Sequence, residues 1–217
     1  MREVNGISSA VVIDNIDPDK IGRVKVRFPQ ANGLGLSGYE TWARISTLMA
    51  GKNRGTWFIP DVNDEVLVAF AGGAADQFYV IGALWSGTSL PPATMDSNNT
   101  KKLLRSRNGV QIILNDQSGQ ESLTVETPGG QKVTLKDGPG SLEITDSNGN
   151  SVTFQASGIL VTSSGKVTIN ANVVEVSSGM VTVNAGMSKF SGVVECDTLI
   201  SNNVVSANYT PGAGNVF

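Results

Sequence analysis

The second half of the chain repeats one short unit, a pair of apolar residues separated by a single residue and followed by a turn. Successive pairs start nine or ten residues apart at Leu123/Val125, Val133/Leu135, Leu142/Ile144 and Val152/Phe154. From Leu160 onward the spacing tightens to seven residues, at Val167/Ile169, Val174/Val176, Val181/Val183 and Ser188/Phe190. A period of two is typical of a strand with one buried face, so the repeat predicts short strands joined by tight turns.

A seven-residue period is also found in coiled coils, but there the apolar positions are three and four residues apart. The pairs in this chain are two residues apart, are rich in β-branched side chains, and are broken by Gly, Asn or Ser in nearly every unit. We therefore interpret the repeat as β-structure and reject a coiled coil.

A single short strand cannot bury its own apolar pair, so the units must stack on something. The coils of a single-chain β-helix usually exceed about 20 residues, because each contains three strands. The units here span seven to ten residues. We therefore expect three identical chains wound around a common axis, each supplying one strand per face in turn, with the apolar residues facing the axis.

The first 86 residues contain five strand-like runs and no strong helical pattern. In GRVKVRF, residues 22–28, apolar and basic side chains alternate strictly. The other runs lie at residues 9–15, 40–45, 64–70 and 78–85. Five strands within this length favour a small barrel of the oligonucleotide/oligosaccharide-binding (OB) type.

The predicted fold class is all-β, an OB-fold-like barrel followed by an intertwined trimeric β-helix. The turn-rich stretch that begins with GTSLPP at residue 87 divides the two parts. The predicted domains are the barrel over residues 1–86, a linker or neck over 87–108, a repetitive β-helical needle over 109–205, and a C-terminal tip segment over 206–217.

The residue types present exclude several kinds of active site. The 217 residues include no histidine and a single cysteine, Cys196. This composition argues against Ser-His-Asp and Cys-His catalytic sites and against a structural zinc site. The formal net charge of −3 argues against a nucleic-acid binder, which would usually be basic. We expect no enzyme activity, no cofactor and no metal.

Several segments of the first domain resemble the OB domain of contractile-tail spike proteins, the family of phage baseplate assembly protein V and VgrG. These segments are GRVKV (22–26), WAR (42–44), FIP (58–60), DEVLVAF (64–70) and IGALW (81–85). The C-terminal repeat is similar to the family's trimeric needle. The resemblance implies structural roles for Gly22, Val24, Trp42, Arg44, Pro60, Asp64, Glu65, Val66 and Gly82.

The resemblance implies a non-enzymatic spike at the tip of an injection machine, which pierces a target membrane and contacts it only transiently. The implied partners are two further copies of the chain, a trimeric baseplate hub that binds the barrel, and a tip protein of the PAAR-repeat kind. The C-terminal segment would bind the tip protein through Tyr209, Pro211, Asn215 and Phe217.

The chain departs from the family pattern at a few points. Asn63 stands where the family usually has Gly, and Asn tolerates a positive φ better than most residues. The absence of histidine removes the iron-binding tip of some relatives. Residues 87–108 leave no room for the lysozyme domain that others carry. The chain begins almost directly with the barrel, so we expect the hub to be a separate protein.

Two other function classes remain open from the sequence. One is a surface-adhesion fibre. The other is an OB-fold module on a stalk that binds nucleic acid or glycan, with Arg23, Lys25, Arg27 and Arg44 beside Trp42 and Tyr39 as its basic face. A solvated strand face explains these residues more simply. Asp61, Asp64 and Glu65 are likewise interpreted as turn residues rather than as an acid-base pair or a cation site.

The N-terminus lacks the apolar segment of a signal peptide. We expect synthesis in the cytoplasm and residence in a phage tail baseplate or an injection-system particle. A phage tail, a tailocin-like particle and another injection system are all compatible with the sequence.

Overall fold

A computed structural model describes residues 6–29, 37–70, 77–138 and 140–208 of the chain. The described residues contain strands and no helix, and none of their segments is a helix able to cross a membrane. The chain divides into two compact units, Met1–Lys166 and Val167–Phe217. The prediction of an all-β chain is confirmed.

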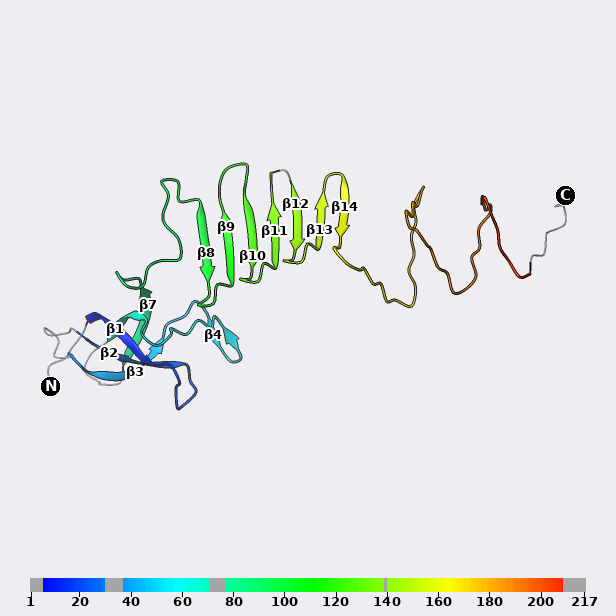
Figure 1. Cartoon of the computed structure of the whole chain (residues 1–217). Coiled ribbons are helices and arrows are strands. Elements are labelled where there is room, and N and C mark those ends of the chain that lie inside the picture. Colours follow the sequence, from blue (N-terminus) through cyan, green and yellow to red (C-terminus); the bar gives the residue numbers. More distant parts are fainter. Residues whose placement is uncertain (1–5, 30–36, 71–76, 139, 209–217) are drawn as a thin grey trace. The chain divides into compact units, whose positions relative to one another are not determined.

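Five strands close into a barrel in the order β1-β2-β3-β7-β6 (Figure 1). Their bounds are β1 Gly6–Asp14, β2 Arg23–Arg27, β3 Glu40–Ile45, β6 Glu65–Phe70 and β7 Phe78–Leu84. All neighbours are antiparallel except β3 and β7, which run parallel. The ends of each strand lie within a few residues of the predicted range. The closed five-stranded barrel confirms the OB-type prediction.

The barrel core consists of the apolar side chains that alternate inward along these strands. It contains Ala10, Val12, Val24, Val26, Phe28, Ala43, Val66, Val68, Phe70, Phe78 and Val80. Three phenylalanines pack against one another, with the ring of Phe28 6.3 Å from that of Phe70 and 5.8 Å from that of Phe78. Branched and aromatic side chains therefore fill the barrel and leave its polar residues outside.

A short hairpin that the sequence did not predict follows β3. It consists of β4 Ala50–Gly51 and β5 Arg54–Gly55, which form a separate two-stranded sheet. The backbone N–H of Thr56 donates to the carbonyl of Met49 at 3.0 Å, and the Thr47 hydroxyl donates to the carbonyl of Thr56 at 2.8 Å. These bonds fix the base of the hairpin.

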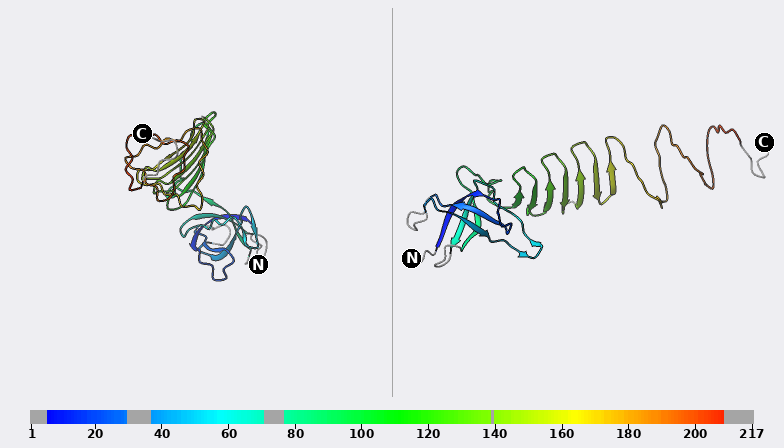
Figure 2. Two further views of the ribbon diagram at one scale, coloured as in Figure 1. Left: turned by 90° about the vertical axis from the view of Figure 1, so that its right-hand side faces the viewer. Right: turned by 90° about the horizontal axis from the view of Figure 1, so that it is seen from below.

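Seven strands follow one another in a single antiparallel sheet, β8 to β14, here named the meander sheet (Figures 1 and 2). Their bounds are β8 Lys101–Arg105, β9 Gln111–Asn115, β10 Ser122–Glu126, β11 Lys132–Lys136, β12 Ser141–Thr145, β13 Ser151–Gln155 and β14 Gly158–Thr162. Each strand pairs with its neighbours in the chain. β8 lies inside the stretch predicted as a linker, and the sheet starts at Lys101 rather than at residue 109.

The expectation that each chain supplies one strand per face in turn is wrong for residues 101–162. Here consecutive strands of the same chain are hydrogen-bonded neighbours, so one chain builds a continuous sheet by itself. The reason lies in the spacing, because a unit of nine or ten residues accommodates a five-residue strand and a turn that reverses the chain. Between residues 163 and 208 the structure describes no strand.

Three turns of the meander sheet share one conformation. They span residues 106–110, 127–131 and 146–150, and the fourth residue of each is a glycine with positive φ: Gly109 (90°), Gly130 (87°) and Gly149 (83°). In each turn the first residue donates its N–H to the carbonyl of the fifth, at 2.8 to 3.1 Å. A glycine closes such a three-residue hairpin loop because the left-handed region costs it little.

Candidate functional site: the apolar face of the meander sheet

One side of the meander sheet is apolar from its first strand to its last. The paired residues form two parallel rows across the strands. One row is Leu114, Leu123, Leu135, Leu142, Phe154 and Ile159. The other row is Leu104, Ile112, Val125, Val133, Ile144, Val152 and Val161. We name these thirteen side chains the apolar face.

The apolar face is uncovered in a single chain. Ten of its thirteen side chains are exposed, among them Leu123 at 37% and Leu135 at 46%. On the opposite face Thr134 is buried, and along β9 and β10 the residues of that face, Ile113 among them, are better covered than those of the apolar face. This pattern is the reverse of that of a strand at a protein surface. Exposed apolar side chains aligned in this way are typical of a face that another protein surface covers.

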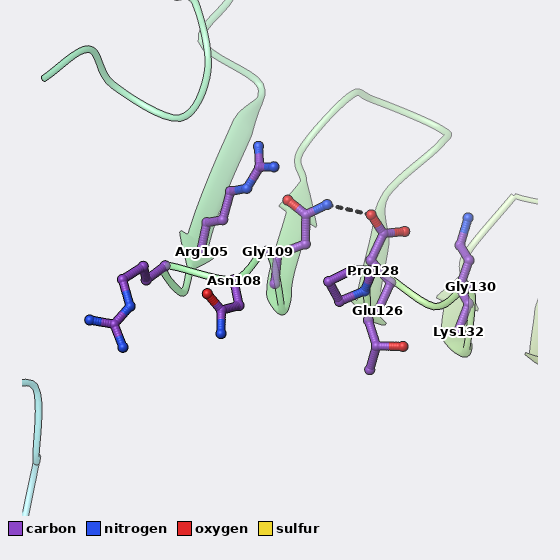
Figure 3. A pocket seen from close by; sticks show the side chains of 10 residues that line it. Arg105, Asn108, Gly109, Glu126, Pro128, Gly130 and Lys132 are labelled. Atoms are coloured by element: carbon purple, nitrogen blue, oxygen red, sulfur yellow. Dashed lines mark hydrogen bonds between the residues drawn. The ribbon is translucent and has the colours of Figure 1, made fainter. Parts of the chain in front are cut away.

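The opposite, polar face is tied together by cross-strand side-chain contacts. Lys136 of β11 forms an ion pair with Glu143 of β12 at 3.0 Å. Gln111 of β9 donates a hydrogen bond to Glu126 of β10, in the row that continues to Lys132 (Figure 3). This polar face is suited to contact with water, whereas the apolar face is not. The two faces of the sheet therefore differ in what they can bind.

A shallow pocket lies on this polar side, between the turns at residues 106–110 and 127–131. Its lining includes Arg105, Gly109, Glu126, Pro128 and Lys132 (Figure 3). The cations and the carboxylate stand along one row of paired residues. The pocket therefore forms where two turns lie next to each other. Its lining is typical of side chains exposed to water at the end of a sheet.

Asp146 holds the third turn in place. Its carboxylate accepts hydrogen bonds from the N–H groups of Asn148 (2.9 Å) and Asn150 (2.8 Å) and from the side-chain amide of Asn150 (2.7 Å). The side-chain bond from Asn150 is the main cause that lowers the pKa of Asp146 to about 2, with the backbone bonds adding to it. The charged carboxylate therefore stabilises the reversal between β12 and β13.

The second unit repeats apolar pairs without a sheet to hold them. Val174, Val176, Val181 and Val183 are exposed, as are the other large apolar side chains described between residues 167 and 208, up to Val205 at 100%. The free energy falls when the apolar surface of such side chains is removed from water. The predicted strands at these pairs are not formed within the described single chain, so their pairing stays a prediction.

The basic residues of β2 are paired with acids. Arg23 lies 2.8 Å from Asp17 and also contacts Asp19. Lys25 and Arg27 both reach Glu40, at 3.0 and 2.6 Å. A surface for nucleic acid needs cations available to phosphates. This pairing supports the simpler interpretation of the strand as a solvated face.

These pairs also shift the titration of the acids. The hydrogen bond from the Arg23 side chain holds the pKa of Asp17 well below its usual range, helped by the backbone N–H groups of Arg23, Ile21 and Asp19. The pKa of Glu40 is lowered chiefly by its bond from Arg27 and then by that from Lys25. The acids therefore remain charged and bound at neutral pH.

The structure shows a packing or backbone feature at most residues of the family motif in the barrel. Gly22 has a φ of 81°, and Val24 and Val66 are fully buried. The guanidinium of Arg23 lies over the ring of Trp42 at 5.6 Å, and that of Arg44 lies over Tyr79 at 5.9 Å. Around Gly82 the pairing of β6 with β7 shifts register. The importance of each residue for assembly stays a prediction.

The segment from Pro60 to Glu65 forms a fixed turn against β1. The carbonyl of Pro60 accepts a hydrogen bond from the amide of Asn15 at 3.1 Å. The carboxylate of Asp64 accepts a hydrogen bond from the backbone N–H of Asp61 at 2.8 Å. Asn63 has a φ of 78°. Asn63 thus occupies the left-handed conformation for which the family usually has Gly. Asp61 also contacts Arg107 at 2.9 Å.

The predicted tip-binding residues Tyr209, Pro211, Asn215 and Phe217 lie outside the described residues. The first part of the apolar face was not predicted from the sequence; it consists of Leu104, Ile112 and Leu114. Ile112 and Leu114 are two residues apart and carried the same signal as the later pairs.

Comparison with known proteins shows that two segments of the chain match known domains. Residues 8–85 match the type VI secretion system/phage-baseplate injector OB domain. Residues 122–187 match the phage baseplate V C-terminal trimerisation domain, which supports a homotrimer. The first match covers the barrel, and the second begins with β10 and extends beyond the meander sheet.

Individual relatives include type VI secretion system spike proteins. The chain is 32% identical over 133 residues to the actin cross-linking toxin VgrG1 of Vibrio cholerae serotype O1, covering 56% of this chain and 12% of that protein. It is 29% identical over 150 residues to the spike protein VgrG1b of Pseudomonas aeruginosa, covering 61% of this chain and 20% of that protein. The spike protein VgrG3 of Vibrio cholerae is 30% identical over 131 residues, covering 56% and 13%.

The chain thus spans about a fifth or less of the length of the relatives it matches. The shared part is the structural spike, an OB domain followed by a trimerisation domain. Both domains and the relatives agree with the resemblance drawn from GRVKV, WAR, FIP and DEVLVAF. The chain belongs to the VgrG-like family of baseplate spike proteins of injection systems.

Proposed function

We propose that this chain is the membrane-piercing part of a contractile injection machine, acting as a trimer whose three meander sheets turn their apolar faces toward a common axis. The uncovered apolar face carries the proposal. Thirteen aligned side chains require a cover, and two further copies of the same face supply one of equal length and chemistry. Each sheet would then form one side of a three-sided needle.

In the second unit the three chains would interwind. The apolar pairs there recur every seven residues, and β14 leaves one edge of the meander sheet without a strand partner in the described chain. An exposed edge accepts a strand from another chain. Residues 163–205 of the neighbouring chains would supply these strands, so that a face built by one chain is continued by three in turn.

The proposed mechanism is mechanical. Contraction of a sheath would drive the spike forward, and the needle would transmit the force to a small area of the target membrane. The barrel would bind a separate trimeric hub and so attach the needle to the rest of the machine. In this proposal the barrel spans residues 1–86, the neck 87–100, the needle 101–205 and the tip segment 206–217, which would bind a PAAR-type tip protein.

The first test is the mass of the purified chain by light scattering, together with an SDS gel run with and without boiling. A trimer weighs about 68 kDa, three times the 22.7 kDa of one chain. We expect that mass in solution and a trimer band that boiling removes, because separating interwound chains breaks hydrogen bonds to two others. A 22.7 kDa species would contradict the proposal.

The second test addresses piercing. Injection particles that carry a spike truncated after residue 108 should assemble with their hub but fail to permeabilise target cells, measured by dye entry. Full-length spike in the same particles is the control. Permeabilisation by the truncated spike at the full rate would show that the needle is not the piercing element.

A further inference from the structure

The barrel presents a second uncovered apolar surface, distinct from that of the meander sheet. It surrounds the β4–β5 hairpin and consists of Ile21, Leu48, Met49, Trp57 and Phe58, here named the hairpin patch. Leu48 is 95% exposed, Trp57 76% and Phe58 71%. All of these residues except Leu48, together with Arg44 and Arg54, line a groove between the hairpin and the end of β3.

The hairpin patch is held in a fixed conformation. Its base is closed by the bond from Thr56 to Met49 and by the contacts between the side chains of Thr47 and Thr56. The ring of Trp57 lies against Gly22, where an added Cβ would be 3.4 Å away. A patch that is already ordered loses little conformational entropy on binding. Trp, Met and Arg are enriched at protein interfaces.

The tip of the hairpin adds positive charge. Lys52 stands on its turn and Arg54 begins β5. Both are exposed, and neither forms an ion pair with another of the residues that the structure describes. The surface is therefore apolar at its centre and basic at its edge. Such a surface fits a partner that combines an apolar side chain with carboxylates.

The chain carries a surface of that composition on the same barrel. The turn at residues 61–65, here named the acidic turn, holds three carboxylates around the exposed side chain of Val62. Its shape is fixed by the bond between Asp64 and the N–H of Asp61 and by the hydrogen bonds of Asn63 and Asp64 with Val12. Asp61 is paired with Arg107 at 2.9 Å, so Asp64 and Glu65 supply the negative charge of the acidic turn, opposite in sign to that of the hairpin tip.

We infer that the hairpin patch of each barrel docks on the acidic turn of the next barrel around the threefold axis, an inference that rests on the proposed trimer. In a ring of three copies each interface joins two different surfaces of the same chain, so both must be present on every copy. Here both are present and ordered, and the meander sheets bring the copies together at high local concentration.

Cysteine cross-linking in the full chain tests this contact. Cys196→Ser removes the native thiol, and Lys52→Cys with Val62→Cys places one thiol on each surface. After treatment with a short bismaleimide and boiling in SDS, we expect a covalent trimer near 68 kDa, because every copy is joined to both neighbours. The two single-cysteine variants are matched controls. They cannot close a ring and should remain at 22.7 kDa.

Light scattering on the same samples separates the two levels of the argument. A trimer that yields no covalent trimer with both cysteines overturns the docking of barrel on barrel and leaves the trimeric needle intact. It would then be a hub or another protein that covers the hairpin patch. A monomer in solution overturns both the inference and the proposed function.

Discussion

Leu123 of β10 and Leu135 of β11 stand directly opposite each other on one face of the meander sheet, and both remain exposed in a single chain. Paired leucines normally contribute to a core. Here they contribute only after another sheet covers them, so trimer formation should depend on them more than the fold of one chain does.

Leu123→Asp should therefore prevent trimer formation. Three carboxylates would have to be buried on the axis without partners, and unpaired buried charges are strongly unfavourable. Ser122→Asp is the matched control, since residue 122 lies on the polar face opposite Lys136. Light scattering should give about 68 kDa for the control and 22.7 kDa for Leu123→Asp. Equal masses for the two variants would contradict the assignment of the face.

Phe28→Ala should destabilise the barrel. The side chain is fully buried and packs against Phe70 and Phe78, so its removal leaves a cavity among rings. Substitutions of this kind cost about 3 to 5 kcal/mol. Chemical denaturation monitored by tryptophan fluorescence measures the loss. Ile16→Ala, at a position 80% exposed, should change the free energy of unfolding by less than about 0.5 kcal/mol.

Gly22→Ala should destabilise the barrel by about 1 to 2 kcal/mol, because alanine is strained at a φ of 81°. The new methyl would lie in ordinary van der Waals contact with the ring of Trp57, at 3.4 Å, so the strain comes from the backbone. Gly87→Ala is the control, since a Cβ there meets no atom within 4 Å. If both alanine variants unfolded at the same denaturant concentration, the glycine of the GRVKV motif would have no conformational role.

Stability should fall in acid through Asp17 and Asp146. Both carboxylates have a lowered pKa in the folded chain, so each stabilises the fold above its unfolded pKa of 3.8 and stops doing so as pH falls through its folded value. For Asp146 the window runs from about pH 4 to about 2. Thermal unfolding across this range, with Asp146→Asn as comparison, measures the contribution. The variant should show the smaller loss of melting temperature in acid.

The sequence predicted the barrel well because its strands alternate clearly. The run at residues 22–28 places Val24, Val26 and Phe28 inward, and the structure buries all three. The β4–β5 hairpin was missed because its strands have only two residues each, which is too short to show a period. A side-chain bond between Thr47 and Thr56 and a backbone bond define it, and neither leaves a pattern in the sequence.

In the repeat, the alternation of apolar and polar side chains was predicted from the sequence, but the pairing of the strands was predicted only in part. The apolar pairs identified the apolar face of the sheet, since an alternation of two fixes which side chains share a side. The pairing partners depend on whether the turns reverse the chain, and the glycines with positive φ at Gly109, Gly130 and Gly149 provide that reversal. β8 was hidden because the basic residues of KKLLR masked Leu104, which begins one row of the apolar face.

The recurrence of one turn at residues 106–110, 127–131 and 146–150 also makes the length of the meander sheet adjustable. Since each strand pairs only with its neighbours in the chain, two strands and their turns can be inserted or deleted without changing which side of any other strand faces the axis. Each such hairpin would alter the reach of the needle by about 10 Å, twice the distance between neighbouring strands. A lineage of these proteins could match the thickness of a new target's envelope by duplicating some twenty codons, with no redesign of the barrel.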